Sequence, residues 1–385
     1  MLGWEFPPFV SGGLGVHCYE LTVRLANMGN DIDFFMPSCS QKLVSPHEKI
    51  RLIEVAPTTL RPYFSFTKKG RMATYGQNLL DAVDTYAKMA AKLVSEEHYK
   101  QPYDIVHAHD WLCAKAGFYS KNAINKPFVQ TIHSTEYDRT SSPWEVILNI
   151  EKDAVKNPNL IIAVSKRTSE QIKRLGADEK KIRVVYNGVD ANKYKFSKIH
   201  SLVNSLKDKK KVLFLGRLTE QKGPVQFLHA AKKVLEKEPN TMFFIAGTGE
   251  LMPLLINLSI QIGLEKHVKF LGFLPDDEQK KIYSACDVYV MPSTSEPFGI
   301  VALEAMASGT PVIISKTSGV SEVVKSALRV DFWDINGMAQ KIISVLRYHP
   351  LRNAMVDMSE EDLKLLTWEN TAQKTFEVYK EALSK

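Results

Sequence analysis

The stretch VYVMPSTSEPFGIVALE, residues 288–304, joins a short apolar run, a loop and the first turns of a helix. Val288–Met291 has the length and composition of a buried strand. Glu296 follows in the loop and Glu304 lies in the helix. A helix start offers unpaired N–H groups and a positive dipole to an anion, while carboxylates accept hydrogen bonds from hydroxyls. The stretch predicts a site for a ligand with a phosphate and hydroxyl groups; two acids alone also fit an ordinary solvated helix.

Similar apolar runs recur along the chain, and segments with helical periodicity separate most of them. Strands that alternate with helices form parallel sheets covered by those helices. The predicted fold class is α/β, with two doubly wound parallel-sheet domains. Ligands are expected at the carboxyl ends of the strands and in the cleft between the domains. The runs are Ile32–Met36, Ile105–Ala108, Phe128–Ile132, Leu160–Val164, Ile182–Tyr186, Val212–Leu215, Met242–Ala246, Val268–Leu271, Val288–Met291 and Val312–Ser315.

The length of 385 residues exceeds one ordinary core and indicates two domains. We assign residues 1–195 to an N-terminal domain and 196–367 to a C-terminal domain, with 192–211 as the linker. The amphipathic stretch 368–385 is expected to return to the N-terminal domain. Residues 46–75 contain prolines and alternating runs such as YFSF at 63–66, so we expect hairpins or loops there.

Composition and charge narrow the possible partners. The chain is 44% hydrophobic and 24% charged, as in ordinary globular proteins, and its net charge of +7 is not gathered into one tract. It carries no base-reading or RNA-stacking motif, so we expect no nucleic-acid partner. No apolar run approaches the roughly 20 residues that span a bilayer. We therefore expect no integral membrane segment, and leave peripheral membrane contact and the oligomeric state open.

The cysteines and the N-terminus bear on the compartment. Four cysteines without a C-x-x-C pair predict buried thiols in a reducing environment. No charged-then-apolar leader opens the chain, so a cytoplasmic location is expected. The opening MLGWEFPP is short for a first strand, which suggests that a few residues are missing or misassigned there.

Two loops carry residues suited to a diphosphate. Gly12, Gly13 and Gly15 precede or open the first helix, where glycine permits close approach of a bulky anion. The sequence there is neither a P-loop nor a full dinucleotide fingerprint, which disfavours ATPase and dehydrogenase functions. Arg217 and Lys222 follow the strand at 212–215 and can bind a diphosphate through forked hydrogen bonds and a point charge. The structural alternatives are a tight turn and a pair of exposed cations.

Polar residues also follow two strands of the N-terminal half. His107, His109 and Asp110 close one strand, and His133 closes the next. Such a group could suggest a metal site, but no further carboxylate or cysteine completes a ligand set, so we predict no metal. His133 is better interpreted as a donor to a sugar hydroxyl or as a partner of a backbone carbonyl, and Asp110 as an acceptor for hydroxyls. We reject the pair at residues 31 and 33 as metal ligands because it introduces a strand.

In their order and spacing, these motifs resemble the retaining GT-B glycosyltransferases that include glycogen, starch and sucrose-type synthases. The resemblance covers nearly the whole chain and is closest to glycogen-synthase-like members. It rests on WEFPP and GGLG within residues 4–15, HAHDW at 107–111, TIH at 131–133, VYNGVD at 185–190, GR and KG within 216–223, and SEPFGIVALE at 295–304.

The resemblance implies transfer of a hexose, chiefly glucose, from a UDP- or ADP-sugar to an acceptor hydroxyl with retention of configuration. An α-glucan is the expected acceptor. Glu304 would hold the ribose and Glu296 the transferred sugar, while His133 and Asp110 would serve the reacting sugar. No metal or other cofactor is required, because cations and a helix dipole can stabilise the departing diphosphate. The groups implied around the diphosphate are Arg217, Lys222 and the backbone near Gly13, Gly15, Phe298, Gly299 and Ile300.

Other functions remain open from the sequence. The acceptor could be a small molecule or a lipid. A sugar-nucleotide epimerase could use the same fold and diphosphate site, and a non-catalytic nucleotide-sugar sensor would bind the donor without releasing nucleoside diphosphate.

For the transfer reaction itself, we favour front-face attack by the acceptor over a glycosyl-enzyme intermediate. Domain closure would exclude water.

Overall fold

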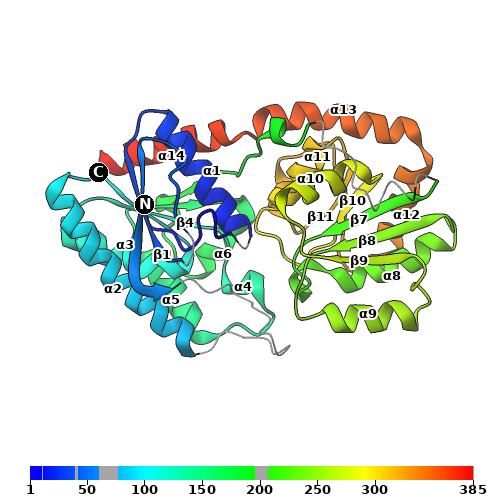
Figure 1. The fold of residues 1–385 in the computed structure, drawn as a ribbon, viewed down its shortest axis with the longest axis horizontal. Helices are drawn as coiled ribbons and strands as arrows, with labels where there is room; N and C mark the ends of the chain where they lie inside the picture. Colours follow the sequence, from blue (N-terminus) through cyan, green and yellow to red (C-terminus); the bar gives the residue numbers. More distant parts are fainter. Residues whose placement is uncertain (11, 40–41, 60–76, 196–205, 207, 385) are drawn as a thin grey trace. The chain divides into compact units, whose positions relative to one another are not determined.

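The computed structural model describes residues 1–10, 12–39, 42–59, 77–195, 206 and 208–384. It divides into a first domain, Met1–Asn187 with Trp368–Lys385, and a second domain, Gly188–Thr367 (Figure 1). The chain thus leaves the first domain at Asn187, earlier than the predicted boundary at residue 195, and the C-terminal helix belongs to the first domain. Much of the predicted linker at 192–211, and the YFSF run at 63–66, lie outside the described residues.

The first domain is built on parallel strands. A four-stranded set has the order β3-β4-β5-β6, and β1 pairs with β2. The N-terminal segment joins the two sets, because Leu2 forms parallel bridges to Phe35 of β1 and to Ala108 of β3. The strands are β1 (Ile32–Ser38), β2 (Ile50–Thr59), β3 (Val106–His109), β4 (Phe128–Ile132), β5 (Leu160–Ala163) and β6 (Ile182–Val184).

Helices cover both faces of this sheet. Successive residues of a strand point to opposite faces: Phe128 of β4 packs in one apolar cluster with Trp111, and Val129 packs in another with Leu21 and Tyr379. The helices are α1 (Gly13–Asn27), α2 (Gln77–Lys100), α3 (Asp110–Ile124), α4 (Glu136–Arg139), α5 (Glu145–Lys156), α6 (Lys166–Arg174) and α14 (Trp368–Leu383), with a 3-10 turn at Glu179–Lys181.

The second domain contains one six-stranded sheet in the order β12-β11-β10-β7-β8-β9, and every strand pair in it is parallel. In chain order this is the 3-2-1-4-5-6 arrangement of a dinucleotide-binding fold, whose direction of winding reverses between its first and fourth strands. That reversal lies here between β7 and β10. The strands are β7 (Lys210–Leu215), β8 (Thr241–Ala246), β9 (Val268–Gly272), β10 (Val288–Met291), β11 (Val312–Ser315) and β12 (Leu328–Val330).

A large apolar core holds this second sheet to its helices, with Phe214, Phe227 and Phe243 fully buried. The helices are α8 (Pro224–Leu235), α9 (Met252–Gln261), α10 (Asp276–Ala285), α11 (Ile300–Ala307), α12 (Ile335–Arg347) and α13 (His349–Leu365). Short 3-10 turns occur at Ala191–Lys193, Glu220–Lys222 and Gly319–Glu322.

The predicted α/β fold is confirmed, and each of the ten apolar runs overlaps a strand. One prediction was wrong in part. We expected hairpins or loops across residues 46–75, but residues 50–59 form β2, which pairs in parallel with β1. The prolines in this segment favour loops, but the burial of Ile50 and Val55 fixes residues 50–59 on the core as a strand.

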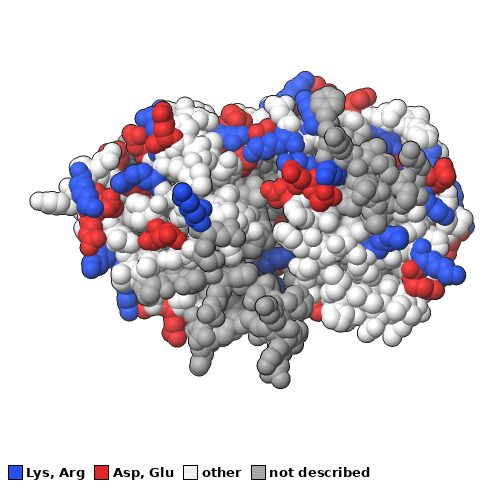
Figure 2. All heavy atoms as spheres, viewed as in Figure 1, with Lys and Arg blue, Asp and Glu red and all other residues white. Residues whose placement is uncertain are grey.

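Surface and cysteine features agree with a globular fold. Over residues 1–384, leaving aside the undescribed segments, no helix has the length and apolar character needed to cross a membrane. None of the four cysteines, all of them described, forms a disulfide; three are buried and Cys39 is half-buried. On the face drawn in Figure 2, basic and acidic side chains are interspersed on both domains.

Candidate functional site

A buried ion pair occupies the reversal point of the second sheet. Lys222 ends the turn after β7, and Glu296 lies in the loop after β10. The Nζ atom of Lys222 donates to Oε2 of Glu296 at 2.6 Å, and these side chains are only 19% and 8% exposed. Because β7 and β10 are adjacent, their carboxyl ends bring together two loops that are far apart in sequence. Open α/β sheets bind ligands at this place.

Local hydrogen bonds fix the two loops. The backbone N–H of Thr294 donates to the carbonyl of Gln221 at 2.9 Å, which ties the β10 loop to the β7 loop. The Ser293 hydroxyl donates to Oε2 of Glu296 at 3.3 Å. The N–H of Glu296 donates to the carbonyl of Thr317 at 3.2 Å. Glu296 is therefore fixed both through its side-chain carboxylate and through its backbone N–H group.

Two glycines are required by this geometry. Gly223 adopts a φ of +71°, and a Cβ there would lie 2.1 Å from the carbonyl oxygen of Pro292. Gly299 caps α11 with a φ of +107°, and a Cβ there would lie 2.9 Å from Met291. Only glycine adopts such backbone angles without strain and permits so close an approach. The loops can therefore meet, and α11 can begin next to Glu296.

The second predicted acid, Glu304, is buried on α11. The hydroxyl of Tyr283 donates to its Oε2 at 3.1 Å. Burial raises the pKa of Glu304, and hydrogen bonds from Tyr194 and Tyr283 oppose that rise. Neither tyrosine was foreseen as part of the site. Tyr283 stands on α10, and only the packing of α10 on α11 reveals its role.

The remaining predicted groups of the second domain differ in exposure. Arg217 is exposed after β7; its carbonyl accepts from Thr219 N–H at 3.0 Å, and its side chain has no hydrogen-bond partner among the described residues. The side chains of Phe298 and Ile300 are buried, so only their backbone groups could face a ligand. The Phe298 carbonyl already accepts from Val320 N–H at 2.8 Å.

The glycines of the first domain have two environments. Gly13 is the exposed first residue of α1. Gly15 is buried, and a Cβ there would lie 2.8 Å from Cγ1 of Val10 and 3.1 Å from Oε2 of Glu5. Gly15 is therefore needed for packing in this domain, while Gly13 leaves the start of α1 open.

Asp110 organises the loop that carries His133. Its Oδ1 accepts from the backbone N–H groups of His133 at 2.8 Å and Ser134 at 3.3 Å. Burial raises the pKa of Asp110 to about 6, although Arg139 and those two N–H groups oppose the shift. Asp110 also adopts a left-handed φ of 57°. Such strain in a residue other than glycine costs about 1–3 kcal/mol and is typical of functional sites.

A half-buried arginine supports the same loop. Arg139 bonds Glu136 at 3.0 Å and also pairs with Glu151, and it donates to the Ser134 hydroxyl at 2.8 Å. The pKa of Glu151 is raised to about 7 by burial, against the opposing charge of Arg139. This network joins the segment after β4 to α5. Nothing in the sequence motifs had pointed to Arg139 or Glu151.

Three histidines converge in the first domain: His17 of α1, His109 at the end of β3 and His133 after β4. One ring nitrogen of each lies within 4.8 Å of one from each of the others. Burial lowers the pKa of His17 and His109 well below the usual value, and that of His133 to about 3, which favours the neutral form of each ring.

The sequence grouped His107 with His109 and His133, and the structure keeps its ring beside that of His109, with centroids 4.3 Å apart, but gives its nitrogens other partners. The Nδ1 atom of His107 bonds the Tyr379 hydroxyl at 2.6 Å, and its Nε2 bonds the Thr131 hydroxyl at 2.7 Å. Both ring nitrogens are therefore occupied by structural bonds. His17 was missed, although it stands beside Cys18 on the apolar stripe of the first helix.

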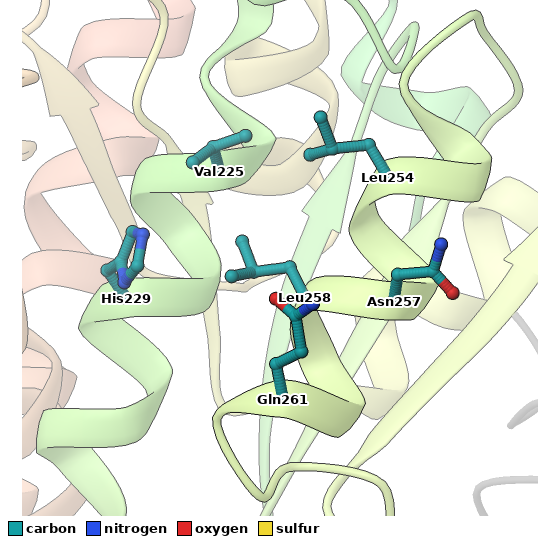
Figure 3. A pocket seen from close by; sticks show the side chains of 6 residues that line it. All are labelled: Val225, His229, Leu254, Asn257, Leu258 and Gln261. Atoms are coloured by element: carbon teal, nitrogen blue, oxygen red, sulfur yellow. The ribbon is translucent and has the colours of Figure 1, made fainter.

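A separate open pocket of about 510 Å³ lies between α8 and α9 (Figure 3). It is lined by Val225, His229, Leu254, Asn257, Leu258 and Gln261. None of these is a residue of the predicted site, and the pocket has no charged acid or cation in its lining.

Related proteins cover the whole chain. It is 32% identical to an uncharacterized glycosyltransferase of Methanocaldococcus jannaschii over 100% of this chain and 98% of that protein. It is 29% identical to a glycogen synthase of Mycobacterium tuberculosis, with 98% and 93% covered. It is 26% identical to a D-inositol 3-phosphate glycosyltransferase of Corynebacterium efficiens, with 97% and 91% covered.

Solved structures share the fold. Sucrose-phosphate synthase from Thermosynechococcus elongatus has a TM-score of 0.81 at 22% identity, covering 99% of this chain and 96% of that chain. The catalytic domain of starch synthase IV from Arabidopsis thaliana, bound to ADP and acarbose, has a TM-score of 0.76 at 19% identity, covering 100% and 99%. The architecture is therefore GT-B.

Family models agree with the two-domain division. Residues 11–193 match Glycosyltransferase Family 4, and residues 195–362 match Glycosyl transferases group 1. Together with the full-length relatives, these matches show that the chain belongs to the group 1 glycosyltransferases of GT-B fold and is a hexosyltransferase.

Proposed function

We propose that this glycosyltransferase moves a hexose, chiefly glucose, from a UDP- or ADP-sugar to an acceptor hydroxyl with retention of configuration, and that an α-glucan is the acceptor. The single observation that carries the proposal is the Lys222–Glu296 pair at the reversal point of the second sheet. It offers a cation for a phosphate and a carboxylate for sugar hydroxyls in one small volume.

The charges suit a departing diphosphate. The Lys222 ammonium has three donors, so it can bond a phosphate oxygen while it keeps Glu296. Arg217 is exposed and can add a forked contact. The start of α11 adds backbone N–H groups next to Gly299. Groups fixed in advance stabilise developing charge most effectively, which supports a reaction that requires no metal or other cofactor.

The hydroxyl groups of the donor are assigned to residues that can hydrogen-bond with them. In the proposal Glu296 binds hydroxyls of the transferred sugar, and Glu304 binds the ribose while Tyr283 holds its carboxylate. From the first domain, His133 donates to the reacting sugar. Asp110 positions the His133 loop through the two N–H bonds described above.

The glycogen synthase among the relatives supports an α-glucan acceptor. The D-inositol 3-phosphate glycosyltransferase supports the second candidate, transfer to a small polar acceptor. Both relatives align over nearly the whole chain, so the acceptor has to be settled by experiment.

The decisive experiment is a matrix of donors and acceptors. UDP- and ADP-hexoses are each incubated with maltooligosaccharides, glycogen, inositol phosphate and a lipid acceptor, and nucleotide release and the anomer of the product are measured. We expect release that depends on an α-glucan, with an α-linked product. Release only with inositol phosphate would favour the second candidate, and a changed sugar without acceptor would indicate an epimerase.

A further inference from the structure

We propose that His17, His109 and His133 form a binding site for one transition-metal cation. Zn²⁺ is the ion that we expect to bind there. Three neutral imidazoles with an open fourth position are an established ligand set for zinc, and imidazole also suits cobalt, nickel and copper ions. The site lies within the first domain, and its existence does not depend on the proposed reaction.

The spacing of the ring nitrogens fits such a cation. Nδ1 of His109 and Nε2 of His133 are 3.2 Å apart and share a hydrogen bond, which a bound ion would replace. Two nitrogens that bind zinc at 2.0–2.1 Å in a tetrahedral site lie about 3.3 Å apart. The third imidazole, His17, packs edge-on at 4.4 Å between ring centroids from His133. All three ligand atoms lie within 4.8 Å of one another, so side-chain rotations can close the site around an ion.

The second observation is the unsatisfied nitrogen of His17. Its Nδ1 bonds Oδ1 of Asn187 at 2.7 Å. An amide oxygen only accepts, so Nδ1 carries the proton and Nε2 keeps its lone pair. That Nε2 is buried and has no partner among the described residues, while His17 is 2% exposed. Buried polar atoms are nearly always paired, and a bound cation would satisfy this one.

Asn187 then has the role of an orienting partner. Metal-binding histidines usually donate their other ring N–H to an oxygen, which fixes the tautomer and ring direction. The Asn187 amide does this for His17 before any ion arrives. His133 is half-buried rather than buried, which leaves an approach for the ion and for the water that would complete four ligands.

Occupation of the site would inhibit transfer. A cation bound to His133 would prevent it from donating to the reacting sugar. This consequence rests on the proposed function, whereas metal binding itself does not. The two can therefore fail separately: binding is measured without donor or acceptor, and inhibition is measured in the transfer assay.

The test is titration of chelator-treated full-length protein with Zn²⁺ by calorimetry, and with Co²⁺ by visible absorption. We expect one ion per chain and the intense bands of tetrahedral cobalt. His17→Gln should abolish saturable binding. Asn187→Ala should weaken it by about 10–100-fold, the usual effect of removing an orienting partner. His229→Gln removes an exposed histidine of the α8–α9 pocket and should change nothing.

Opposite results would overturn the inference. These are no binding stronger than that of scattered surface histidines, or unchanged binding in His17→Gln. Loss of binding in His229→Gln would also contradict the proposed site. Thermal unfolding checks that each variant folds. If His17→Gln does not fold, His133→Gln provides the same decision, because retained one-to-one binding in it would exclude the trio, and unchanged affinity in Asn187→Ala would exclude its orienting role.

Discussion

The two domains place their functional residues in the same topological position but use different chemistry. At the reversal point of the second sheet, the ends of β7 and β10 carry an ion pair, Lys222 with Glu296. In the first domain, the N-terminal segment and β3 are neighbours, and three neutral histidines with Asp110 gather near the following loops. The second domain thus offers a fixed ion pair, and the first offers buried imidazole rings beside a carboxylate that holds the His133 loop.

The difference follows from what each part of a sugar nucleotide demands. A diphosphate needs cations and backbone N–H groups. A hexose is uncharged, and a buried ionised histidine next to it would carry a large desolvation penalty. Burial keeps the imidazoles neutral, which suits hydroxyl chemistry. The comparison predicts that substitutions at the site of the second domain lower activity by removing charge. Substitutions at the site of the first domain should lower activity by displacing a loop.

The largest effect is expected for Lys222→Ala. It removes a preorganised cation and leaves the Glu296 carboxylate buried without its ammonium partner. We expect kcat to fall by about 10²–10³-fold, the usual effect of removing one stabilising donor. Arg217→Ala should lower transfer in the same direction. The measurement is nucleotide release at saturating donor.

The matched control is Lys316→Ala, which removes a more exposed lysine paired with Asp331 in the same domain. Exposed ion pairs contribute little, so its kcat should stay near that of the wild type. Unchanged turnover in Lys222→Ala would show that the charge of Lys222 does not contribute to transfer.

An intermediate effect is expected for Asp110→Ala. Alanine cannot accept from the N–H groups of His133 and Ser134, and it tolerates a left-handed φ poorly. We expect a loss of about 1–3 kcal/mol in the free energy of unfolding, together with slower transfer. Asp110→Asn keeps an acceptor oxygen and suits that φ better, so it should recover part of both losses. Equal losses in urea unfolding for the two variants would show that the loop does not depend on this acceptor.

The smallest effect is expected for Tyr283→Phe, which removes the hydroxyl that donates to Glu304. A single hydrogen bond contributes about 1 kcal/mol, so nucleoside-diphosphate affinity should fall roughly fivefold while kcat changes little. The control is Tyr289→Phe, whose hydroxyl donates instead to the carbonyl of Leu215 at 3.1 Å. Calorimetric titration with UDP and ADP measures both. Equal losses in the two variants would count against a specific role for Tyr283.

The sequence by itself determined the α/β class and the ten strands named from apolar runs, and it predicted a site at the charged residues of the second domain. These features are local: a buried strand is a short apolar run, and Lys222 and Glu296 each stand in a loop directly after one. Glycines mark the same loops in the sequence, and the structure gives Gly223 and Gly299 a positive φ. Residue type and position were therefore enough to select them.

Only the tertiary structure decided which residues meet. His17, His109 and His133 come from three segments, and no local pattern distinguishes His17 from an ordinary core histidine. The structure also occupies both ring nitrogens of His107 with Tyr379 and Thr131, although its ring still packs on His109, and it brought Tyr283 to Glu304. The physical reason is that strand order and helix packing set distances between remote segments, while sequence periodicity records only which face of its own element a residue occupies.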